Sequence, residues 1–368
     1  MKRRLLLGAA AIGAANSMSL QSHAQSKSEA VASNDSPIIR WRLATSWPKS
    51  LDIVFGNVDF LCRRVSAITD GRFTITPYEA NEIAPGLEVM DSVSSGAVEC
   101  GHTASYYYIS KQAALGFGTT VPFGLNTQQQ LAWLLNDGLE AIQQIYSDFN
   151  IINFPSGSTG AQMGGWFKQE IISISDLQGL KMRIPGLGGE VMKRLGVDVQ
   201  ALAGDKIYEQ LEQGKIDAAE WVGPYEDEKL GLNRVARFYY YPGWWEPGTT
   251  YELQVNLDHW NELPTAYQEA IRVASIETHG KMLGEYDVAN GEALQRLLVT
   301  GTRLSPFSPE ILQAAQTAAF ELYEEIAAKN STFRQIYQQW QVFRTEIYSW
   351  NRVNELSFNQ LHTAALPS

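Results

Sequence analysis

The sequence is poor in cysteine. Only two of its 368 residues are cysteines, Cys62 and Cys100. Small secreted domains that depend on disulfides use many more, so a disulfide scaffold is excluded. Both cysteines lie in apolar stretches, which favours two buried free thiols over a bridge between them. No CxxC, HExxH or Cys/His cluster occurs, and the sequence therefore predicts no zinc site.

Basic charge is also scarce. The chain has 29 Lys and Arg against 40 Asp and Glu, which gives a formal net charge of −11 at pH 7. A strongly acidic protein repels nucleic acid, so nucleic acid is excluded as a partner. An anionic ligand would need a local site built from one or two well-placed cations. With 45% hydrophobic and 19% charged residues, the composition is that of a globular protein.

Long hydrophobic runs are missing beyond the N-terminus, so no membrane-spanning helix is expected there. The first residues instead show the three parts of a signal peptide, which are a basic start, an apolar core and a small-x-small cleavage site: Lys2-Arg3-Arg4, residues 5–15 and Ser22-His23-Ala24. This pattern predicts a signal peptide over residues 1–24 and export to the periplasm. The Arg3-Arg4 pair also allows the twin-arginine route. The polar residues 25–37 are expected to form a flexible lead.

Strand and helix patterns alternate along the rest of the chain. Period-two or short apolar runs predict strands at 38–45, 73–78, 98–103, 151–154, 162–168, 182–184, 197–201, 218–222 and 250–256. Helical spacing predicts helices at 52–68, 86–95, 127–149, 188–195, 206–213, about 264–300, 309–329 and from about 332 onward. The alternation predicts an α/β fold, and the length suggests roughly two domains.

The last predicted helix carries apolar side chains at helical spacing: Phe333, Ile336, Tyr337, Trp340, Phe343 and Ile347. Such a stripe most often packs into a core. The alternative is a helix that binds a partner or forms a dimer.

Four polar side chains stand within apolar or aromatic strings, where burying a charge is costly unless it is paired. They are Gln162 in GAQMGGWF, Arg183 in LKMRIPG, Glu220 in DAAEWVGP and Glu246 in PGWWEPG. Any one of them alone could be a surface residue at a strand end, but four in the same context point to a shared site. Arg183 is the candidate anion receptor, because its planar fork matches a carboxylate. It could instead pair with a neighbouring carboxylate of the protein.

The charges of such a site would not balance. If Glu220 and Glu246 face one cavity with a ligand carboxylate, three negative charges meet one guanidinium. Like charges about 4 Å apart repel by roughly 4 kcal/mol at an effective dielectric constant near 20. Either one glutamate keeps a proton or a cation joins the site, and oxygen ligands suit sodium or calcium.

The residues alone leave two other functions open. Glu220 and Glu246 beside tryptophans could be the acid and base of a secreted glycoside hydrolase, although Arg183 would then have no clear purpose. A sugar or osmolyte receptor of an ATP-driven system could also use the tryptophans. No GxSxG, SxxK, GxGxxG or GxxxxGK[ST] motif is present, and we expect a binding protein rather than an enzyme.

Several long strings around these residues resemble the extracytoplasmic solute receptors of tripartite ATP-independent periplasmic (TRAP) transporters, the family of C4-dicarboxylate-type receptors. They are LQGLKMRIPG, LEQGKIDAAEW, ECGHTASYYY, GSTGAQMGGWF, EWVGPYEDEKLG and YYYPGWWE, and the resemblance runs from about residue 39 to 356. Trp221 directly after Glu220 is similar to the branch that binds monocarboxylate 2-oxo acids.

The resemblance implies a periplasmic-binding-protein-like α/β fold, with two lobes that close on a ligand cleft by a hinge. Lobe I would hold residues 38–160 plus about 250–290, and lobe II residues 161–249 plus part of about 291–310. Residues 309–368 would be C-terminal helices that could form a homodimer. The implied partner is the membrane permease of the transporter.

The resemblance also implies roles for the site residues. Arg183 would hold the ligand carboxylate, and Tyr107 would reach the ligand with its hydroxyl, although Tyr107 could equally be a core tyrosine. A cation would be surrounded by Gln162, Glu220, Glu246 and the backbone carbonyl of Trp221. The expected ligand is a pyruvate-like 2-oxo acid with sodium, and the alternative is a 2-hydroxy acid such as lactate with calcium.

Overall fold

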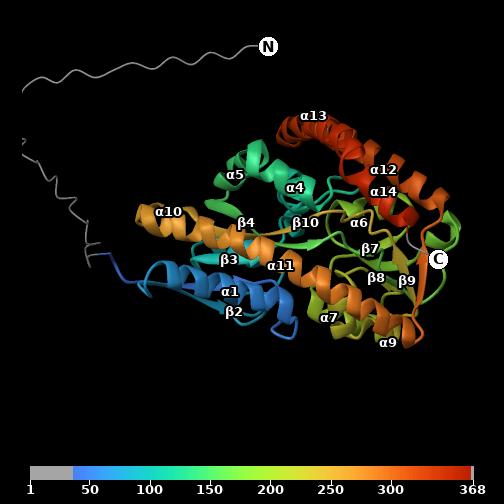
Figure 1. The fold of residues 1–368 in the computed structure, drawn as a ribbon, viewed down its shortest axis with the longest axis horizontal. Helices are drawn as coiled ribbons and strands as arrows, with labels where there is room; N and C mark the ends of the chain where they lie inside the picture. The colour runs from blue at the N-terminus through green and yellow to red at the C-terminus, as the bar shows by residue number, and fades with distance from the viewer. Residues whose placement is uncertain (1–35, 366–368) are drawn as a thin grey trace, which may run out of the picture. The chain divides into compact units, whose positions relative to one another are not determined.

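Two β-sheets and a set of long helices make up the protein (Figure 1). The computed structural model describes residues 36–365, with side chains through residue 361. The predicted signal peptide and nearly all of the predicted flexible lead therefore lie outside the described residues. The expected α/β fold with long C-terminal helices is confirmed.

The first sheet has the strand order β2-β1-β3-β10-β4. Its strands are β1 (Ile39–Thr45), β2 (Phe73–Tyr78), β3 (Cys100–Thr103), β4 (Ile151–Gly160) and β10 (Thr249–Asn256). Strand β1 runs parallel to β2 and β3, whereas β10 is antiparallel to β3 and β4. All eight residues of β10 are buried, because strands and helices cover it on every side.

The second sheet has the strand order β11-β9-β5-β8-β6-β7. Its strands are β5 (Trp166–Phe167), β6 (Lys181–Arg183), β7 (Asp198–Gln200), β8 (Ala218–Ala219), β9 (Phe238–Tyr241) and β11 (Arg303–Pro306). Strand β6 is parallel to β7 and β8, and β5 is antiparallel to β8 and β9. The chain passes from the first sheet to the second after β4 and returns after β9.

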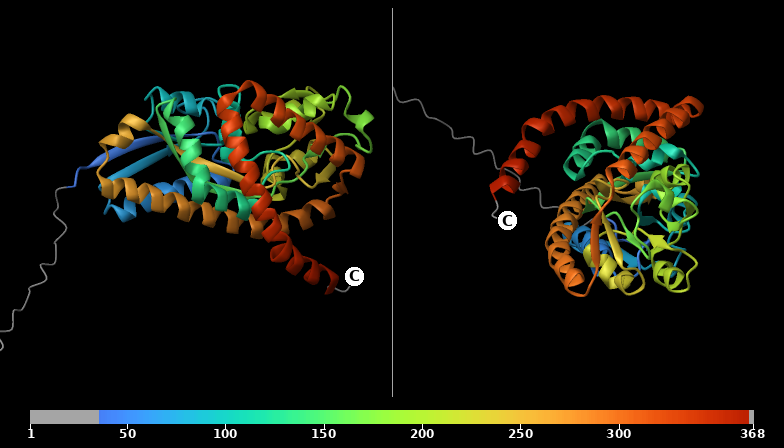
Figure 2. Two further views of the ribbon diagram at one scale, coloured as in Figure 1. Left: turned by 90° about the horizontal axis from the view of Figure 1, so that it is seen from above. Right: turned by 90° about the vertical axis from the view of Figure 1, so that its right-hand side faces the viewer.

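Helices cover both sheets and extend beyond them (Figure 2). The α-helices are α1 (Asp52–Ile68), α2 (Val89–Ser94), α3 (Gly116–Thr119), α4 (Thr127–Trp133), α5 (Leu139–Ser147), α6 (Gly186–Arg194), α7 (Gly204–Glu212), α8 (Pro224–Leu230), α9 (Leu232–Val235), α10 (Leu257–Glu262), α11 (Thr265–Val299), α12 (Pro309–Lys329), α13 (Ser331–Val353) and α14 (Glu355–Ala365). Short helical turns are η1 (Ser105–Tyr108), η2 (Ala113–Leu115), η3 (Leu134–Gly138) and η4 (Ile174–Leu177).

Helix α11 joins the two halves. It has 35 residues, which at 1.5 Å per residue is about 50 Å. It packs against β4 and α1 of the first half and against α8 of the second half, and Figure 1 shows it running beside both sheets. No helix within residues 36–365 combines the length and the apolar character needed to cross a membrane.

Two predicted elements differ from the observed ones. The predicted helix 127–149 is broken at residues 134–138, where Asn136 has non-helical dihedral angles. The predicted strand 162–168 shrinks to Trp166–Phe167, because Gly165 has a φ of 76° and interrupts the extended backbone. A Cβ on Gly164 would lie 2.8 Å from the backbone of Tyr240. Strands β9 and β11 were not predicted, since β9 (FYYY) does not alternate and β11 (RLSP) has only four residues.

The core confirms two predictions. Cys62 and Cys100 are both buried and both free, and burial raises the pKa of each thiol. The aromatic stripe of α13 packs into the core, since Phe333 and Trp340 are fully buried and lie 5.2 and 5.5 Å from the ring of Phe117. The stripe is therefore core packing, as its spacing indicated.

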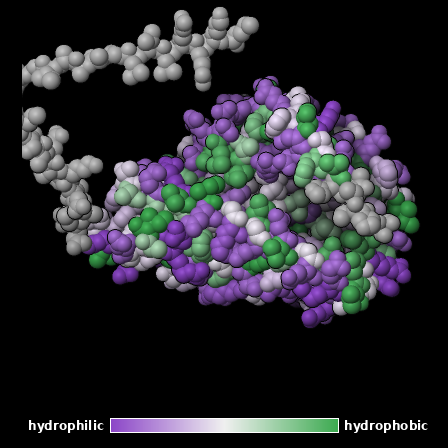
Figure 3. Space-filling model, viewed as in Figure 1, coloured by the Kyte–Doolittle hydropathy of each residue, from purple (hydrophilic) through white to green (hydrophobic). Residues whose placement is uncertain are grey.

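On the face of the protein shown in Figure 3, hydrophilic residues alternate with smaller hydrophobic groups.

Acid is expected to destabilise the protein through His102, which is fully buried in β3. Trp47 donates to its Nδ1 at 2.8 Å, and its Nε2 faces the carbonyl of Ser156 at 3.2 Å. Burial lowers the pKa of His102 to about 4, below the value near 6.5 of an unfolded chain. The unfolded state therefore binds the proton more tightly, and the free energy of unfolding falls as the pH drops from about 6.5 towards 4, by about 2 kcal/mol between pH 7 and pH 5.

The His102→Asn variant, which keeps an acceptor near the Nδ1 position, is expected to lose most of this pH dependence. Urea unfolding at pH 7 and pH 5 measures the two free energies in each protein. Burial also lowers the pKa of His279 to about 4. That histidine is present in both proteins, so its contribution to the pH dependence cancels when the two are compared. An equal pH dependence in wild type and variant would show that His102 is not responsible.

Candidate functional site

The second sheet brings two of the predicted residues to one edge. Arg183 ends β6, and Glu220 follows the last residue of β8. The two strands are parallel neighbours in which Arg183 is paired with Ala219. Their carboxyl ends therefore meet, which is where open α/β sheets bind ligands. Trp221 comes next in the chain.

Arg183 is buried and only partly satisfied. It is 1% exposed. Its Nε donates to the carbonyl of Leu202 at 2.9 Å, and its Nη1 donates to the carbonyl of Glu220 at 2.8 Å and to a carboxylate oxygen of Glu220. The pairing with a neighbouring carboxylate that the sequence left open is therefore real. Its Nη2 has no hydrogen-bond partner among the described residues, so half of the guanidinium fork remains to bind an anion.

The two glutamates lie together. Glu220 is fully buried and Glu246 is 4% exposed, and the two carboxyl groups are close enough to affect each other's ionisation. Burial raises the pKa of both, that of Glu246 to about 7, while Arg183 opposes the shift. The hydroxyl of Thr249 donates to Glu246 at 2.9 Å. Without an added cation, one of the two carboxyl groups therefore tends to keep its proton.

Gln162 and Trp221 complete the group on the second-sheet side. The backbone N–H of Gln162 donates to the carbonyl of Glu246 at 3.0 Å, and its Nε2 donates to the hydroxyl of Thr159 at 3.2 Å. Its Oε1 is buried and has no partner among the described residues. The ring of Trp221 lies 5.2 Å from the guanidinium carbon of Arg183, which favours the charged form of the arginine.

Tyr107 reaches the site from the first half of the protein. It lies in η1, and its hydroxyl interacts with the Arg183 guanidinium, which opposes the burial that raises its pKa to about 12. Its ring lies 6.4 Å from that of Trp47, which is also 6.4 Å from Trp221. Trp47 thus forms an aromatic contact between the two halves beside the site.

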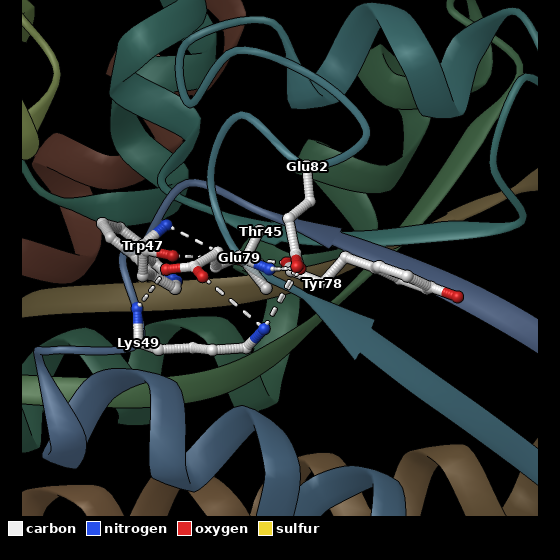
Figure 4. Close-up of polar contacts among 6 residues, drawn as sticks. All are labelled: Thr45, Trp47, Lys49, Tyr78, Glu79 and Glu82. Carbon is white, nitrogen blue, oxygen red and sulfur yellow. Dashed lines mark hydrogen bonds and ion pairs between the residues drawn. The ribbon is translucent and has the colours of Figure 1, made fainter.

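A polar network holds the segment that carries Trp47 (Figure 4). The Thr45 hydroxyl donates to the carbonyls of Trp47 and Tyr78, at 3.0 and 2.9 Å. The backbone N–H of Lys49 donates to Glu79 at 2.9 Å, and its ammonium group pairs with Glu79 and Glu82. The segment after β1 is therefore fixed to the end of β2, which orients the Trp47 ring.

A cation has matching ligands here. The buried Oε1 of Gln162 and Oε2 of Glu220 both lack partners among the described residues. Both are hard oxygen donors, and with Glu246 and the Trp221 carbonyl they suit sodium or calcium. No group of three or more His, Cys, Asp or Glu that could hold a metal occurs within residues 36–365. The donor set named above combines carboxylate, amide and backbone carbonyl oxygens, which suit a hard ion.

Sequence reasoning missed three contributors to this site. Thr249 donates to Glu246, Tyr106 interacts with the same carboxyl group and lowers its pKa, and the carbonyl of Leu202 accepts from Arg183. Tyr106 belongs to the string ECGHTASYYY and Thr249 directly follows PGWWEPG, so their positions in the chain could have suggested them. A backbone carbonyl such as that of Leu202 carries no side-chain signal.

The glycoside hydrolase is not supported by this geometry. Hydrolytic carboxyl pairs stand about 5 to 9.5 Å apart so that a sugar or a water fits between them. Glu220 is instead paired with Arg183, and its buried carboxyl group lies close enough to that of Glu246 for the two to affect each other's ionisation. The arrangement is that of a site that binds a small anion.

Comparison with known proteins agrees with this class. Residues 43–330 match the family model of "Bacterial extracellular solute-binding protein, family 7". A curated protein of Nostoc sp. (strain PCC 7120), named Monocarboxylate 2-oxoacid-binding periplasmic protein all3028, is 58% identical over 366 residues, which cover 99% of this chain and 100% of that protein.

Two solved structures are also similar. A TRAP transporter solute-binding protein from Bordetella bronchiseptica RB50, a dimer with calcium and picolinate in one of its sites, has 45% identity and a TM-score of 0.88 over 89% of this chain and 98% of that one. A TRAP periplasmic solute-binding protein from Pseudoalteromonas atlantica T6c, with sodium and pyruvate, has 35% identity and a TM-score of 0.85 over 88% of this chain and 98% of that one.

Fold and site together define a solute-binding protein rather than an enzyme. The chain belongs to the bacterial extracellular solute-binding proteins of family 7, which include receptors of TRAP transporters. The resemblance identified in the sequence is thereby confirmed.

Proposed function

We propose that this protein is the periplasmic receptor of a TRAP transporter, that it binds a pyruvate-like 2-oxo acid together with a cation, and that it delivers the acid to the membrane permease. The halves built on the first and second sheets would be the two lobes. They would hinge about the segments that connect the sheets and close on the ligand.

One observation carries this proposal. Three polar atoms at a single buried site have no partner among the described residues, namely Nη2 of Arg183, Oε1 of Gln162 and Oε2 of Glu220. An unpaired buried polar atom costs about 1 to 3 kcal/mol of stability. A ligand that pairs with all three atoms would remove this cost, and the gain would favour binding. One is a donor that fits a carboxylate, and two are acceptors that fit a cation.

A 2-oxo acid fits this pattern of atoms. Its carboxylate can accept a charge-assisted bond from Nη2 of Arg183. Its keto oxygen and a carboxylate oxygen can chelate a cation held by Gln162, Glu220, Glu246 and the Trp221 carbonyl. The Tyr107 hydroxyl would donate to the ligand from the other half. The names of the relatives from Nostoc and Pseudoalteromonas, which mention 2-oxoacid and pyruvate, support this choice.

The cation is proposed to be sodium, with calcium as the alternative. A bound monocarboxylate, Glu220 and Glu246 carry three negative charges against one on Arg183. Calcium would neutralise the surplus completely. Sodium would neutralise half of it and leave the site with a single negative charge. The solved relatives contain either ion. A 2-hydroxy acid such as lactate could chelate calcium in the same way and is the alternative ligand.

Titration with short acids tests the proposed function. Tryptophan fluorescence or calorimetry would follow pyruvate, longer 2-oxo acids, lactate and succinate, each with sodium, with calcium and with chelator alone. We expect saturable 1:1 binding of 2-oxo acids that is at least tenfold tighter with one of the two ions. Equal binding of succinate, or no binding of any monocarboxylate, would contradict the proposal.

We further propose that α13 and α14 form a homodimer interface. Their outer faces expose apolar side chains that the chain itself does not cover, with exposures between 44% and 68%: Val342, Trp350, Val353, Leu356 and Leu361. Figure 2 shows this end of the chain leaving the body of the protein. Exposed apolar groups of this size mark protein interfaces, and the Bordetella relative is a dimer.

The double variant Trp350→Glu/Val353→Glu is expected to shift the protein from dimer to monomer in sedimentation or light scattering, while its circular dichroism stays unchanged. The control is Val299→Glu, which alters an 88% exposed residue at the end of α11 and should leave the dimer intact. A monomeric wild-type protein would contradict this interface.

A further inference from the structure

Helix α8 begins three residues after Trp221 and is fixed to the site by Asp227. The buried carboxylate of Asp227 accepts from the indole of Trp166 at 2.9 Å and from the hydroxyl of Tyr239 at 2.8 Å. It also accepts from the backbone N–H groups of Val222 and Gly223, at 3.1 and 3.2 Å. Helix α8 therefore moves as one body with the segment that carries Glu220 and Trp221.

The other side of α8 meets the start of α1, which belongs to the first half of the protein. Helix α1 has no local cap, because its N-cap residue is Leu51 and no side chain of that position accepts a hydrogen bond. The first backbone N–H groups of a helix need acceptors. Glu226 of α8 is fully buried here, and its carboxylate interacts with the backbone N–H of Val54 in the first turn of α1.

Glu226 is held in place by α11. The hydroxyl of Tyr286 donates to its Oε1 at 2.7 Å, and its Oε2 has no regular hydrogen-bond partner among the described residues. Burial raises the pKa of Glu226 to about 7 in spite of these contacts. A carboxyl group that is expensive to bury thus sits at the positive end of a helix that lacks its own cap.

Tyr225 and Lys229 make a second contact between the same two helices. The Tyr225 hydroxyl donates to both carboxylate oxygens of Asp52, at 3.2 and 3.0 Å, and the Lys229 ammonium lies 3.1 Å from Asp52. The Lys229–Asp52 pair is partly exposed and contributes little by itself. The Tyr225 backbone N–H is fixed to Asn290 of α11 at 3.0 Å, which orients the ring towards α1.

We propose that Glu226 and Tyr225 form a clasp that caps α1 only when the two halves are closed, so that they tighten ligand binding as positioning residues without touching the ligand. This inference rests on the proposed two-lobe receptor function. Opening the lobes would return the first turn of α1 and the Glu226 carboxylate to water. A contact present only in the closed state raises the population of that state, and the apparent affinity rises by the same factor.

Stopped-flow fluorescence with pyruvate and the tighter-binding cation tests the clasp. The variants are Tyr225→Phe, which removes one hydroxyl from a half-buried ring, and Glu226→Gln, which removes the charge but keeps the shape. Each is expected to raise the ligand dissociation rate about 3- to 10-fold, with an association rate within twofold of wild type, because the contacts form after the ligand has entered.

The matched control is Tyr208→Phe on α7. Its hydroxyl also donates to a carboxylate, that of Glu212 at 3.0 Å, but both groups belong to one helix. The control should leave the dissociation rate unchanged. Without ligand, Tyr225→Phe should unfold at the same midpoint as the wild-type protein, because an open receptor lacks the contact. A residue that only supports the fold would lower that midpoint instead.

Hydrogen exchange separates failure of the clasp from failure of the proposed function. If wild type and Tyr208→Phe bind no 2-oxo acid, the function is wrong. If they do bind the acid, the clasp predicts faster exchange of the amides in residues 52–55 in ligand-saturated Glu226→Gln than in ligand-saturated wild type. Dissociation rates within twofold of wild type in both variants, or unchanged exchange of these amides, would overturn the clasp.

Discussion

Arg183→Ala is expected to weaken pyruvate binding by at least 100-fold. The ligand carboxylate would lose its bonds to the guanidinium, which contribute about 1.5 to 3 kcal/mol each. The same change leaves Glu220 buried beside Glu246 without its positive partner. Removing one member of a buried ion pair costs about 3 to 5 kcal/mol, so the unfolding midpoint should also fall. Calorimetry and thermal unfolding measure the two effects.

Two further variants separate recognition from folding. Arg183→Lys keeps the positive charge beside Glu220 and should restore most of the lost stability, but an ammonium cannot serve Glu220, Leu202 and a ligand as a planar fork does. Its affinity should stay at least tenfold below wild type. Arg194→Ala breaks an exposed ion pair with Glu325 and should change neither quantity. Pyruvate binding by Arg183→Ala within a few-fold of wild type would exclude Arg183 as the carboxylate receptor.

Glu246→Gln is expected to stabilise the ligand-free protein while it weakens binding. Glutamine keeps the acceptor for Thr249 but removes one of two neighbouring buried carboxyl groups, whose burial raises the pKa of Glu246 to about 7. Stabilisation of about 0.5 to 2 kcal/mol is typical when a functional site loses such strain. The cation loses one charged ligand, so its affinity should fall at least tenfold.

A variant that gains stability and loses cation affinity would identify Glu246 as a ligand of the cation. Thermal unfolding in chelator gives the stability, and a cation titration at fixed pyruvate gives the affinity. The matched control is Glu252→Gln, a buried glutamate of the first sheet that is bonded to Asn153 and Gln254 away from the site. It should leave cation affinity unchanged. A Glu246→Gln variant that loses stability and keeps wild-type cation affinity would assign Glu246 to structure only.

Much of the fold could be predicted from the sequence because local patterns agree with it. The helix over Asp52–Ile68 and the strand over Phe73–Tyr78 have the predicted bounds, since their apolar spacing matches one buried face. The helix predicted at 309–329 has these bounds as well, and the side chain of Ser308 caps it. The two-residue strands β5 and β8 are defined by their neighbours and not by their own residues, so their limits could not be predicted.

The candidate site could be predicted in part. Polar residues within apolar strings of the sequence pointed to Gln162, Arg183, Glu220 and Glu246. The structure brings all four together. The pairing of Arg183 with Glu220 had been left open, because chain spacing does not show which carboxylate a guanidinium meets. The interaction of Glu226 with the first turn of α1 joins residues that are far apart in the chain, so chain spacing could not predict it.

A crystal structure of the protein with pyruvate and the tighter-binding cation tests the central claim most directly. We predict a carboxylate oxygen within about 3 Å of Nη2 of Arg183, and a cation in direct contact with Oε1 of Gln162 and Oε2 of Glu220. These are the three buried atoms that now have no partner among the described residues. A ligand bound elsewhere, or a complex in which these atoms still contact neither acid nor ion, would contradict the account.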